Sequence, residues 1–321
     1  MKYKLKKISG DASFREFYRL KKNNNKSSVI VFAKKEKFKN LAVYTVINNV
    51  LNDNKINAPK LLSNHYKNDM IEISDLGEKS FYDLVISKKN KLNSYKSLIK
   101  LLIKMQKIKV KKYYKFEKLK IKIPKYTSSI LHKESDLFFD WYLKYVLRKK
   151  KISKIKKILR SELNKVYKKL NYKNNTFVHR DFHISNVMIN KNKLGIIDSQ
   201  DAIIGNPLYD VSSIIDDVRI KLPNELQNQL LDFYHKNSKL KNDQIQKLKN
   251  DFDILSVQRN LKILGIFVRL YKRDNKDNYL KFLPYTWALI EKRLQNHALK
   301  DLKILFHKQL PIKKLKRLNK I

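Results

Sequence analysis

Three polar residues in one short stretch of the sequence could do chemistry together. Asp181 follows an apolar run, Asn186 comes five residues later, and Asp198 ends the next short apolar run. A carboxylate near an attacking hydroxyl can orient or deprotonate it, while a second carboxylate and an amide oxygen can hold Mg²⁺ against phosphate groups. The pattern therefore indicates phosphoryl transfer, with Asp181 as the base and Asn186 and Asp198 as metal ligands.

The spacing of these residues follows a known catalytic pattern. His179-Arg180-Asp181 and Asn186 fit the H-R-D-x-x-x-x-N motif of kinase catalytic loops, in which a metal-binding aspartate closes the next hairpin. A plain β-hairpin with polar ends would explain any one of them alone. Agreement of all three in order, spacing and strand-end position favours the functional interpretation. We expect His179 to brace the hairpin rather than to touch a substrate.

The elements that must position these residues predict a two-lobed protein-kinase-like fold of the α+β class. Residues 1–75 show three strands, a helix and two strands, and residues 76–321 are mostly helical. The lobes are expected to meet at Asp75–Gly77, where the strand pattern breaks. Strands are expected at residues 3–8, 14–20, 29–33, 60–63 and 70–74. Helices are expected at residues 40–52, 80–86, 92–108, 134–147, 152–170, 224–236, 243–270 and 278–294, and after Pro207. Residues 109–127 are expected to form a loop.

The N-terminal lobe supplies the candidates for nucleotide binding. A turn between its first two strands could cover phosphates with backbone amides, although an ordinary hairpin turn would look the same. A lysine after the third strand is the nearest counterpart of the kinase phosphate-binding lysine. The predicted cofactor-binding residues are Gly10, Asp11, Ala12, Ser13, Phe14, Lys34 and Asp75.

Composition limits the other classes of function. The net charge is +44, but 62 of the 73 basic residues are lysines scattered through every segment, which is typical of solvated faces rather than of a specific nucleic-acid site. There is no cysteine, which excludes disulfides and thiolate metal sites and favours an intracellular location. No apolar run approaches the roughly 18 residues of a membrane span. We expect a soluble, cytoplasmic monomer without a membrane partner. The competing class is a non-catalytic protein that binds polyanions through its charge.

Several motifs resemble known families. HRDFHISN, IIDSQDA and GNPLYDVSSIIDD resemble the aminoglycoside phosphotransferase and choline kinase family. GDASFREFYRL, ISDLGEKSFYDL and QRNLKILGIFVRLYKRDNKDNYLKFLP extend the resemblance over nearly the whole chain to the bacterial anomeric kinases of N-acetylmuramate and N-acetylglucosamine. That resemblance implies ATP and Mg²⁺ as cofactors, and phosphorylation of an amino sugar at its anomeric hydroxyl in cell-wall sugar recycling. An aminoglycoside, choline or another small alcohol is the alternative acceptor.

Four further residues are candidates for the acceptor site: Gln200, Asp201, Arg219 and Arg259. They form a mixed rather than an acidic group, whereas cationic acceptors favour acidic or aromatic pockets. N-acetylmuramate carries a carboxylate that N-acetylglucosamine lacks, and a guanidinium is its natural partner. Arg259, a charge within an apolar helical pattern, is the expected partner, and Arg219 is the second choice. An ordinary surface arginine remains the alternative for Arg259.

Overall fold

The computed structural model describes residues 4–8, 15–21, 27–33, 39–147, 152–190 and 193–311. Backbone packing divides the chain into two compact units. Unit 1 comprises residues 1–124 and 177–203, and unit 2 comprises residues 125–176 and 204–321. Unit 1 therefore holds both the small sheet and the catalytic stretch. A lobe boundary after residue 75 stays a prediction.

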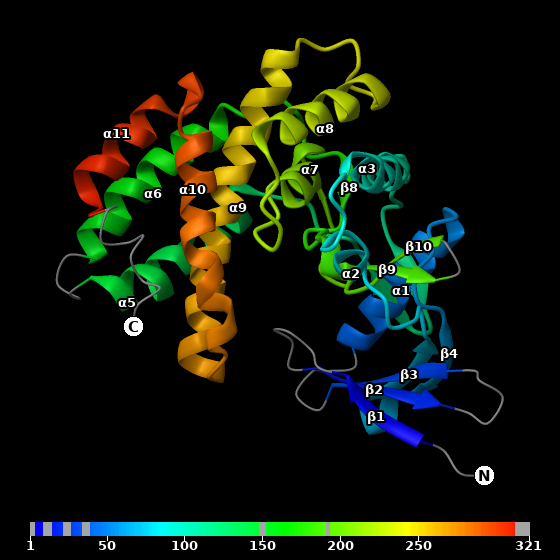
Figure 1. The fold of residues 1–321 in the computed structure, drawn as a ribbon. Helices are drawn as coiled ribbons and strands as arrows, with labels where there is room; N and C mark the ends of the chain where they lie inside the picture. The colour runs from blue at the N-terminus through cyan, green and yellow to red at the C-terminus, as the bar shows by residue number, and fades with distance from the viewer. Residues whose placement is uncertain are drawn as a thin grey trace. The chain divides into compact units, whose positions relative to one another are not determined.

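Unit 1 is built on a five-stranded antiparallel sheet in the order β1-β2-β3-β5-β4 (Figure 1). Its strands are β1 (Lys4–Ile8), β2 (Glu16–Lys21), β3 (Ser27–Phe32), β4 (Leu61–His65) and β5 (Met70–Ser74). Helix α1 (Lys39–Asp53) lies between β3 and β4 in the sequence. The predicted order of three strands, a helix and two strands is confirmed.

Alternating side chains of the sheet form one core with α1. Val29 and Val31 on β3 are buried with Ile71 on β5, and they pack with Leu41 and Tyr44 of α1. Successive residues of a strand point to opposite faces, so this alternation places one apolar face of the sheet under the helix. This packing fixes the position of α1 against the sheet of unit 1.

A left-handed glycine marks the end of the sheet. Gly77 has φ +96°, a conformation that costs other residues strain, and it is the third residue after β5. Helix α2 (Phe81–Val85) then begins with a capping box in which Ser80 and Asp83 satisfy each other's backbone amides. Helix α3 (Leu92–Gln106) follows it.

The catalytic stretch forms the expected hairpin within unit 1. Strand β8 (Thr176–Val178) leads into the loop, and β9 (Val187–Asn190) pairs with β10 (Lys193–Ile196). The backbone amides of Ile189 and Ile196 donate at 2.8 Å to the carbonyls of Lys79 and Asn57. A Cβ on Gly195 would come within 2.8 Å of the Asn57 side chain, so glycine permits this close approach.

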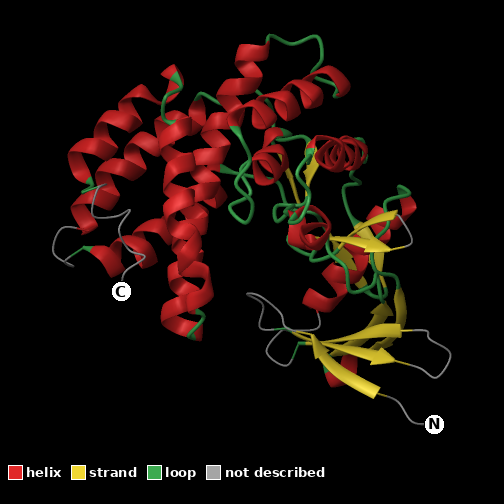
Figure 2. Cartoon of the chain, in the orientation of Figure 1, coloured by secondary structure: helices red, strands yellow, loops and turns green. Residues whose placement is uncertain are grey.

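Unit 2 is mostly helical, with α9 (Ile245–Asp274) as its longest element (Figure 2). Helix α9 packs against α4, α7, α10 and the π-helical turn η2 that extends α4. The other elements are α4 (Ser128–Leu137), η2 (Phe138–Leu143), α5 (Lys144–Val146), α6 (Ile152–Lys168), β11 (Ile203–Gly205), α7 (Leu208–Ile215), α8 (Asn224–Asn237), η5 (Asp277–Phe282), α10 (Leu283–Arg293) and α11 (Lys300–Gln309). No helix in the described ranges has the length and hydropathy to cross a membrane.

The structure corrects three of the expected elements. Residues 109–127 contain a short hairpin, β6 (Tyr114–Phe116) and β7 (Leu119–Ile121), rather than only a loop. The helix expected from residue 134 begins at Ser128, where the Thr127 side chain caps it. Helix α11 lies beyond the last expected helix. Its pattern is weak because Leu302 and Phe306 are its buried residues, while Ile304 is exposed.

Candidate active site

The catalytic loop has a strained backbone at two positions. Arg180 has φ +77° and Asp198 has φ +61°, both in the left-handed region that non-glycine residues rarely adopt. Such strain costs about 1–3 kcal/mol and persists where the surrounding structure enforces it, frequently at functional sites. The two strained residues belong to the two motifs that the sequence singled out.

Hydrogen bonds set the orientation of Asn186. Its side-chain nitrogen donates to the backbone carbonyl of Asp181 at 3.0 Å. Its backbone carbonyl accepts from the backbone amide of Ile197 at 3.0 Å. The first bond fixes the side-chain amide and leaves its oxygen as the atom available to a cation. The second bond joins the catalytic loop to the residue before Asp198. Nε2 of His179 donates to the carbonyl oxygen of Ile197 at 3.1 Å, which is the kind of contact that the predicted bracing role requires.

Asp198 lies in a field that favours a bound cation. The pKa of its carboxyl is raised to about 6. Burial is the largest cause, and the negative charge of Asp181 is the second. Two carboxylates close enough to interact in this way are stabilised together when a cation lies between them. The described residues contain no cluster of three or more His, Asp or Glu side chains that could hold a metal by themselves. A magnesium ion held by Asn186 and Asp198 fits this donor set, because Mg²⁺ usually takes one or two protein ligands plus phosphate oxygens and water.

Residues of α1 contact the Asp198 end of the hairpin. The hydroxyl of Ser199 donates at 2.7 Å to the side-chain oxygen of Asn48, and both residues are buried. Burial raises the pKa of Tyr44, and the charge of Asp198 contributes to the shift, so this tyrosine lies near the carboxylate. The sequence analysis missed both α1 residues. A polar Asn48 on the buried side of an apolar helix was the available signal, since buried amides need partners.

The predicted acceptor residues fall in different places. Gln200 donates at 2.8 Å to the carboxylate of Asp198, and Asp201 is exposed with its carboxylate 4.0 Å from Arg180. Arg219 pairs with Asp217 at 3.1 Å in unit 2. Arg259 is buried on α9 in unit 2. None of the four assignments is tested by these contacts, and each stays a prediction.

The nucleotide candidates are only partly described. Gly10, Asp11, Ala12, Ser13, Phe14 and Lys34 lie outside the described residues. Asp75 pairs with Arg19 on β2, with Nε–Oδ2 2.6 Å, and accepts the Gly77 amide at 2.9 Å. The positive charge of Arg15, at the start of β2, lowers the pKa of Asp198 against the larger effect of burial. Arg15 is therefore a cation near Asp198 that the sequence analysis did not single out.

Comparison with known proteins agrees with this geometry. Residues 4–244 match the phosphotransferase enzyme family. The chain belongs to that family. It is 28% identical over 297 residues to the N-acetylmuramate/N-acetylglucosamine kinase of Pseudomonas aeruginosa, covering 88% of this chain and 81% of the relative. It is 25% identical over 284 residues to the protein of the same name from Neisseria meningitidis, covering 86% and 81%.

Solved structures show the same fold at low sequence identity. A thermostable mutant of aminoglycoside phosphotransferase APH(4)-Ia superposes with a TM-score of 0.64 at 13% identity, covering 90% of this chain and 94% of the other. ADP-bound aminoglycoside phosphotransferase APH(2'')-Ib superposes with a TM-score of 0.60 at 15% identity, covering 92% and 93%. The predicted kinase-like α+β fold is confirmed, and the chain is a phosphotransferase.

Proposed function

We propose that this phosphotransferase uses ATP to phosphorylate the anomeric hydroxyl of an amino sugar, N-acetylmuramate or N-acetylglucosamine. The observation that carries the chemistry is the fixed amide of Asn186, whose nitrogen is bound to the Asp181 carbonyl and whose oxygen is left for a cation. The sugar is supported by the two relatives named above, which bear that activity in their names. ATP is supported by the ADP in the APH(2'')-Ib structure.

Each residue of the site has a distinct part in this proposal. Asp181 accepts a hydrogen bond from the acceptor hydroxyl and takes its proton as that oxygen attacks the γ-phosphorus of ATP, and ADP leaves. Asn186 and Asp198 hold Mg²⁺, which neutralises charge on the phosphates when bound. Gln200 and His179 keep Asp198 and the hairpin in place through the hydrogen bonds described above. Catalysis then comes mainly from positioning and electrostatic stabilisation.

The nucleotide side of the proposal rests on the small sheet. Residues 10–14 and Lys34 lie outside the described residues and are proposed to bind the phosphates on the sequence pattern alone, and Arg15 is a second candidate for the cation. Arg15 has support from its electrostatic effect on Asp198. Asp75, which directly follows β5, is the remaining candidate for nucleotide binding.

Replacement of Asp181 tests the base assignment. Asp181→Asn removes the proton acceptor with little change in shape, so turnover should fall about 10²–10⁴-fold while nucleotide affinity stays within a few-fold. Phosphate transfer is followed by ADP release in a coupled assay, and nucleotide affinity by calorimetry with MgATP. Asp69→Asn is the matched control, because Asp69 lies in a turn with φ +54°, which asparagine tolerates well. Near-full activity of Asp181→Asn would remove the base role from this residue.

A panel of acceptors tests the substrate. N-acetylmuramate, N-acetylglucosamine, an aminoglycoside and choline are each offered with ATP, and ³¹P NMR locates the phosphate on the product. The proposal expects an anomeric phosphate on at least one amino sugar. Phosphorylation of choline or the aminoglycoside alone would overturn the substrate and leave the kinase.

A further inference from the structure

A cavity of about 360 Å³ lies within unit 2. It is bounded by the first turns of α4, the last turns of α6 and the segment of residues 170–174 that follows α6. Cavities of this volume fall at the small end of the range that holds small-molecule ligands. All ten residues that line it belong to unit 2, and none belongs to the catalytic stretch, so the cavity is complete within that unit.

The lining of the cavity is positively charged and contains no acidic side chain. Leu131 and Tyr167 are buried and form its floor, while Lys168 and Lys173 are exposed at its mouth. Neither lysine forms an ion pair or a side-chain hydrogen bond with another described residue. The cavity therefore favours a ligand that is anionic and has an apolar face.

The wall that carries the loop residues is held in place by α9. Asp251 accepts from the backbone amides of Asn171 and Tyr172 at 2.7 and 2.9 Å. Asp251 is fully buried, so these bonds are shielded from water. The cavity is thus formed before any ligand arrives, which lowers the entropic cost of binding.

Three asparagines of the lining are each held by one end of the side-chain amide. The oxygen of Asn164 accepts from a histidine of α4 at 3.3 Å. The nitrogen of Asn171 donates to the carboxylate of Asp251 at 2.9 Å, and the nitrogen of Asn174 donates to the backbone carbonyl of Tyr126 at 3.0 Å. These bonds leave one amide donor, on Asn164, and two acceptor oxygens, on Asn171 and Asn174.

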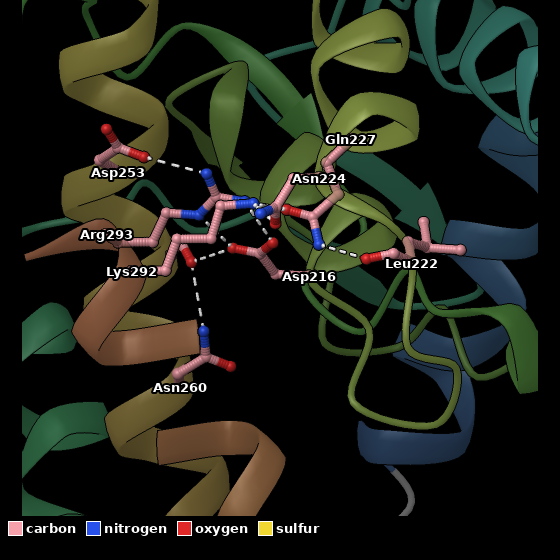
Figure 3. Close-up of polar contacts among 9 residues, drawn as sticks. Asp216, Leu222, Asn224, Gln227, Asp253, Asn260, Lys292 and Arg293 are labelled. Carbon is pink, nitrogen blue, oxygen red and sulfur yellow. Dashed lines mark hydrogen bonds and ion pairs between the residues drawn. The ribbon is translucent and has the colours of Figure 1, made fainter. Parts of the chain in front are cut away.

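A buried amide elsewhere in unit 2 has both of its ends engaged (Figure 3). The nitrogen of Gln227 donates to the carbonyl of Leu222 at 3.1 Å, and its oxygen accepts from Lys292 at 2.6 Å and from Arg293 at 2.7 Å. Buried polar groups are normally satisfied in this way. The cavity asparagines differ, because one end of each is left to water or to a ligand.

A buried hydroxyl on the floor of the cavity is also left over. Tyr167 is 7% exposed, and its enclosed hydroxyl has no hydrogen-bond partner among the described residues. Ser135 is close enough to affect the ionisation of Tyr167, but its own hydroxyl lies 3.2 Å from two backbone carbonyls of α4, to which it donates. A ligand that reaches the floor of the cavity can supply the missing partner.

We propose that this cavity is a second ligand site that binds a sugar phosphate, a small anion with several hydroxyl groups. The two lysines pair with the phosphate. The free oxygens of Asn171 and Asn174 accept from sugar hydroxyls, and the free nitrogen of Asn164 donates to one. Inorganic phosphate would leave the two oxygens without a hydroxyl donor, and a neutral sugar would leave the lysines without a counter-charge. The site lies in unit 2 and is independent of the acceptor proposed above.

The test measures binding by calorimetry with three probes: glucose 6-phosphate, inorganic phosphate and glucose. A salt concentration of about 0.15 M screens nonspecific attraction to the net charge of +44. The full chain is compared with Lys168→Gln/Lys173→Gln, which removes both charges at the mouth of the cavity. Lys154→Gln/Lys157→Gln is the matched control, because it removes two exposed lysines of α6 that lie about 16 Å or more from Lys168 along the helix.

Glucose 6-phosphate should bind the parent and the control variant with equal affinity, and the cavity variant about tenfold or more weakly, as expected for lost charge-assisted hydrogen bonds. Inorganic phosphate and glucose should each bind the parent about tenfold or more weakly than glucose 6-phosphate. Ser128→Trp provides a second variant, because it places a large side chain at the cavity from an exposed position in the first turn of α4, and it should also weaken binding.

Four results would overturn the inference. They are no binding of glucose 6-phosphate, equal losses in the two lysine variants, unchanged affinity in the cavity variant, and binding of inorganic phosphate or glucose as tight as that of glucose 6-phosphate. Equal losses would indicate nonspecific attraction, and unchanged affinity would place the ligand elsewhere, the active site included. Turnover with ATP should be the same in all variants, so failure of this inference and failure of the proposed function are separate results.

Discussion

Replacing Arg19 should destabilise unit 1 selectively. Its guanidinium forms a fork on Asp75, with Nε–Oδ2 at 2.6 Å and Nη2–Oδ1 at 3.1 Å, and Nη2 also donates to the carbonyl of Gly77 at 2.9 Å. The Arg19 side chain is 10% exposed and that of Asp75 is 4% exposed. This pair fastens β2, near the middle of the sheet, to the segment that follows β5.

The structure sets the size of the effect. Arg19→Met leaves a buried carboxylate without its cation, which typically costs 3–5 kcal/mol. The contact with Glu78 adds little, because that side chain is 58% exposed. Arg19→Met/Asp75→Leu removes both charges, so it should recover about 2 kcal/mol or more of that loss.

Acid should weaken the same interaction. Burial alone would raise the pKa of Asp75, but hydrogen bonds from Arg19, Ser27 and the Gly77 amide outweigh it and hold the pKa below its ordinary value. A carboxyl with a lowered folded pKa stabilises the protein above its unfolded pKa of about 3.9 and loses that effect as the pH falls through the folded pKa. The Arg19 variant should therefore differ least from the parent at strongly acidic pH.

The assay must read the two units separately. Hydrogen exchange of β3 and β5 amides reports opening of unit 1. Fluorescence reports unit 2, because both tryptophans, Trp141 and Trp287, belong to it. Arg19→Met should speed exchange in the sheet and leave the fluorescence transition nearly unchanged. The reasoning is refuted if exchange in the sheet is unaffected, or if the double variant is less stable than both single variants.

Two further predictions concern unit 2. Gly265→Ala should destabilise unit 2, because an added Cβ would lie 2.3 Å from the Leu137 backbone. The cost of this clash should exceed the ~1 kcal/mol that alanine gains over glycine in helix propensity. A variant that is more stable in urea, read by fluorescence, would contradict the close packing of α9 on α4. Burial raises the pKa of Asp253 to about 6 against the opposing charge of Arg293. From about pH 4 to 6 the carboxyl therefore ionises in the unfolded chain but stays largely protonated in the folded protein, so stability should fall by about 2–3 kcal/mol over that interval. Asp253→Asn should be more stable than the parent at pH 7.5 and show a weaker pH dependence over that interval, and lower stability at pH 7.5 would refute the reasoning.

Much of the fold could be predicted because its patterns are strong and local. The strands at residues 29–33 and 70–74 and the helix at residues 40–52 agree with β3, β5 and α1 to within two residues. Helix α11 and the hairpin of β6 and β7 were missed, because short elements with few buried residues leave little periodic signal. Their positions depend on packing against distant segments, which sequence spacing does not record.

The candidate site divides in the same way. Asp181, Asn186 and Asp198 were recognisable because loop geometry fixes their spacing along the chain. The supporting contact between Asn48 and Ser199 joins residues 151 positions apart, and no local sequence pattern predicts it. The sequence singled out Arg259 as a charge in an apolar helix, but only the structure shows that Glu134, on the neighbouring α4, is already engaged by other partners.

The balance of charges in the chain matters most for its buried residues. The chain has 73 basic and 29 acidic residues, so carboxylates are scarce and most lysines have no acidic partner. An exposed lysine needs none, because water solvates it, and the net charge of +44 therefore says little about function. A buried cation is different, since no solvent compensates it. In unit 2 the buried acids Glu134 and Asp216 are paired with Lys262 and Arg293.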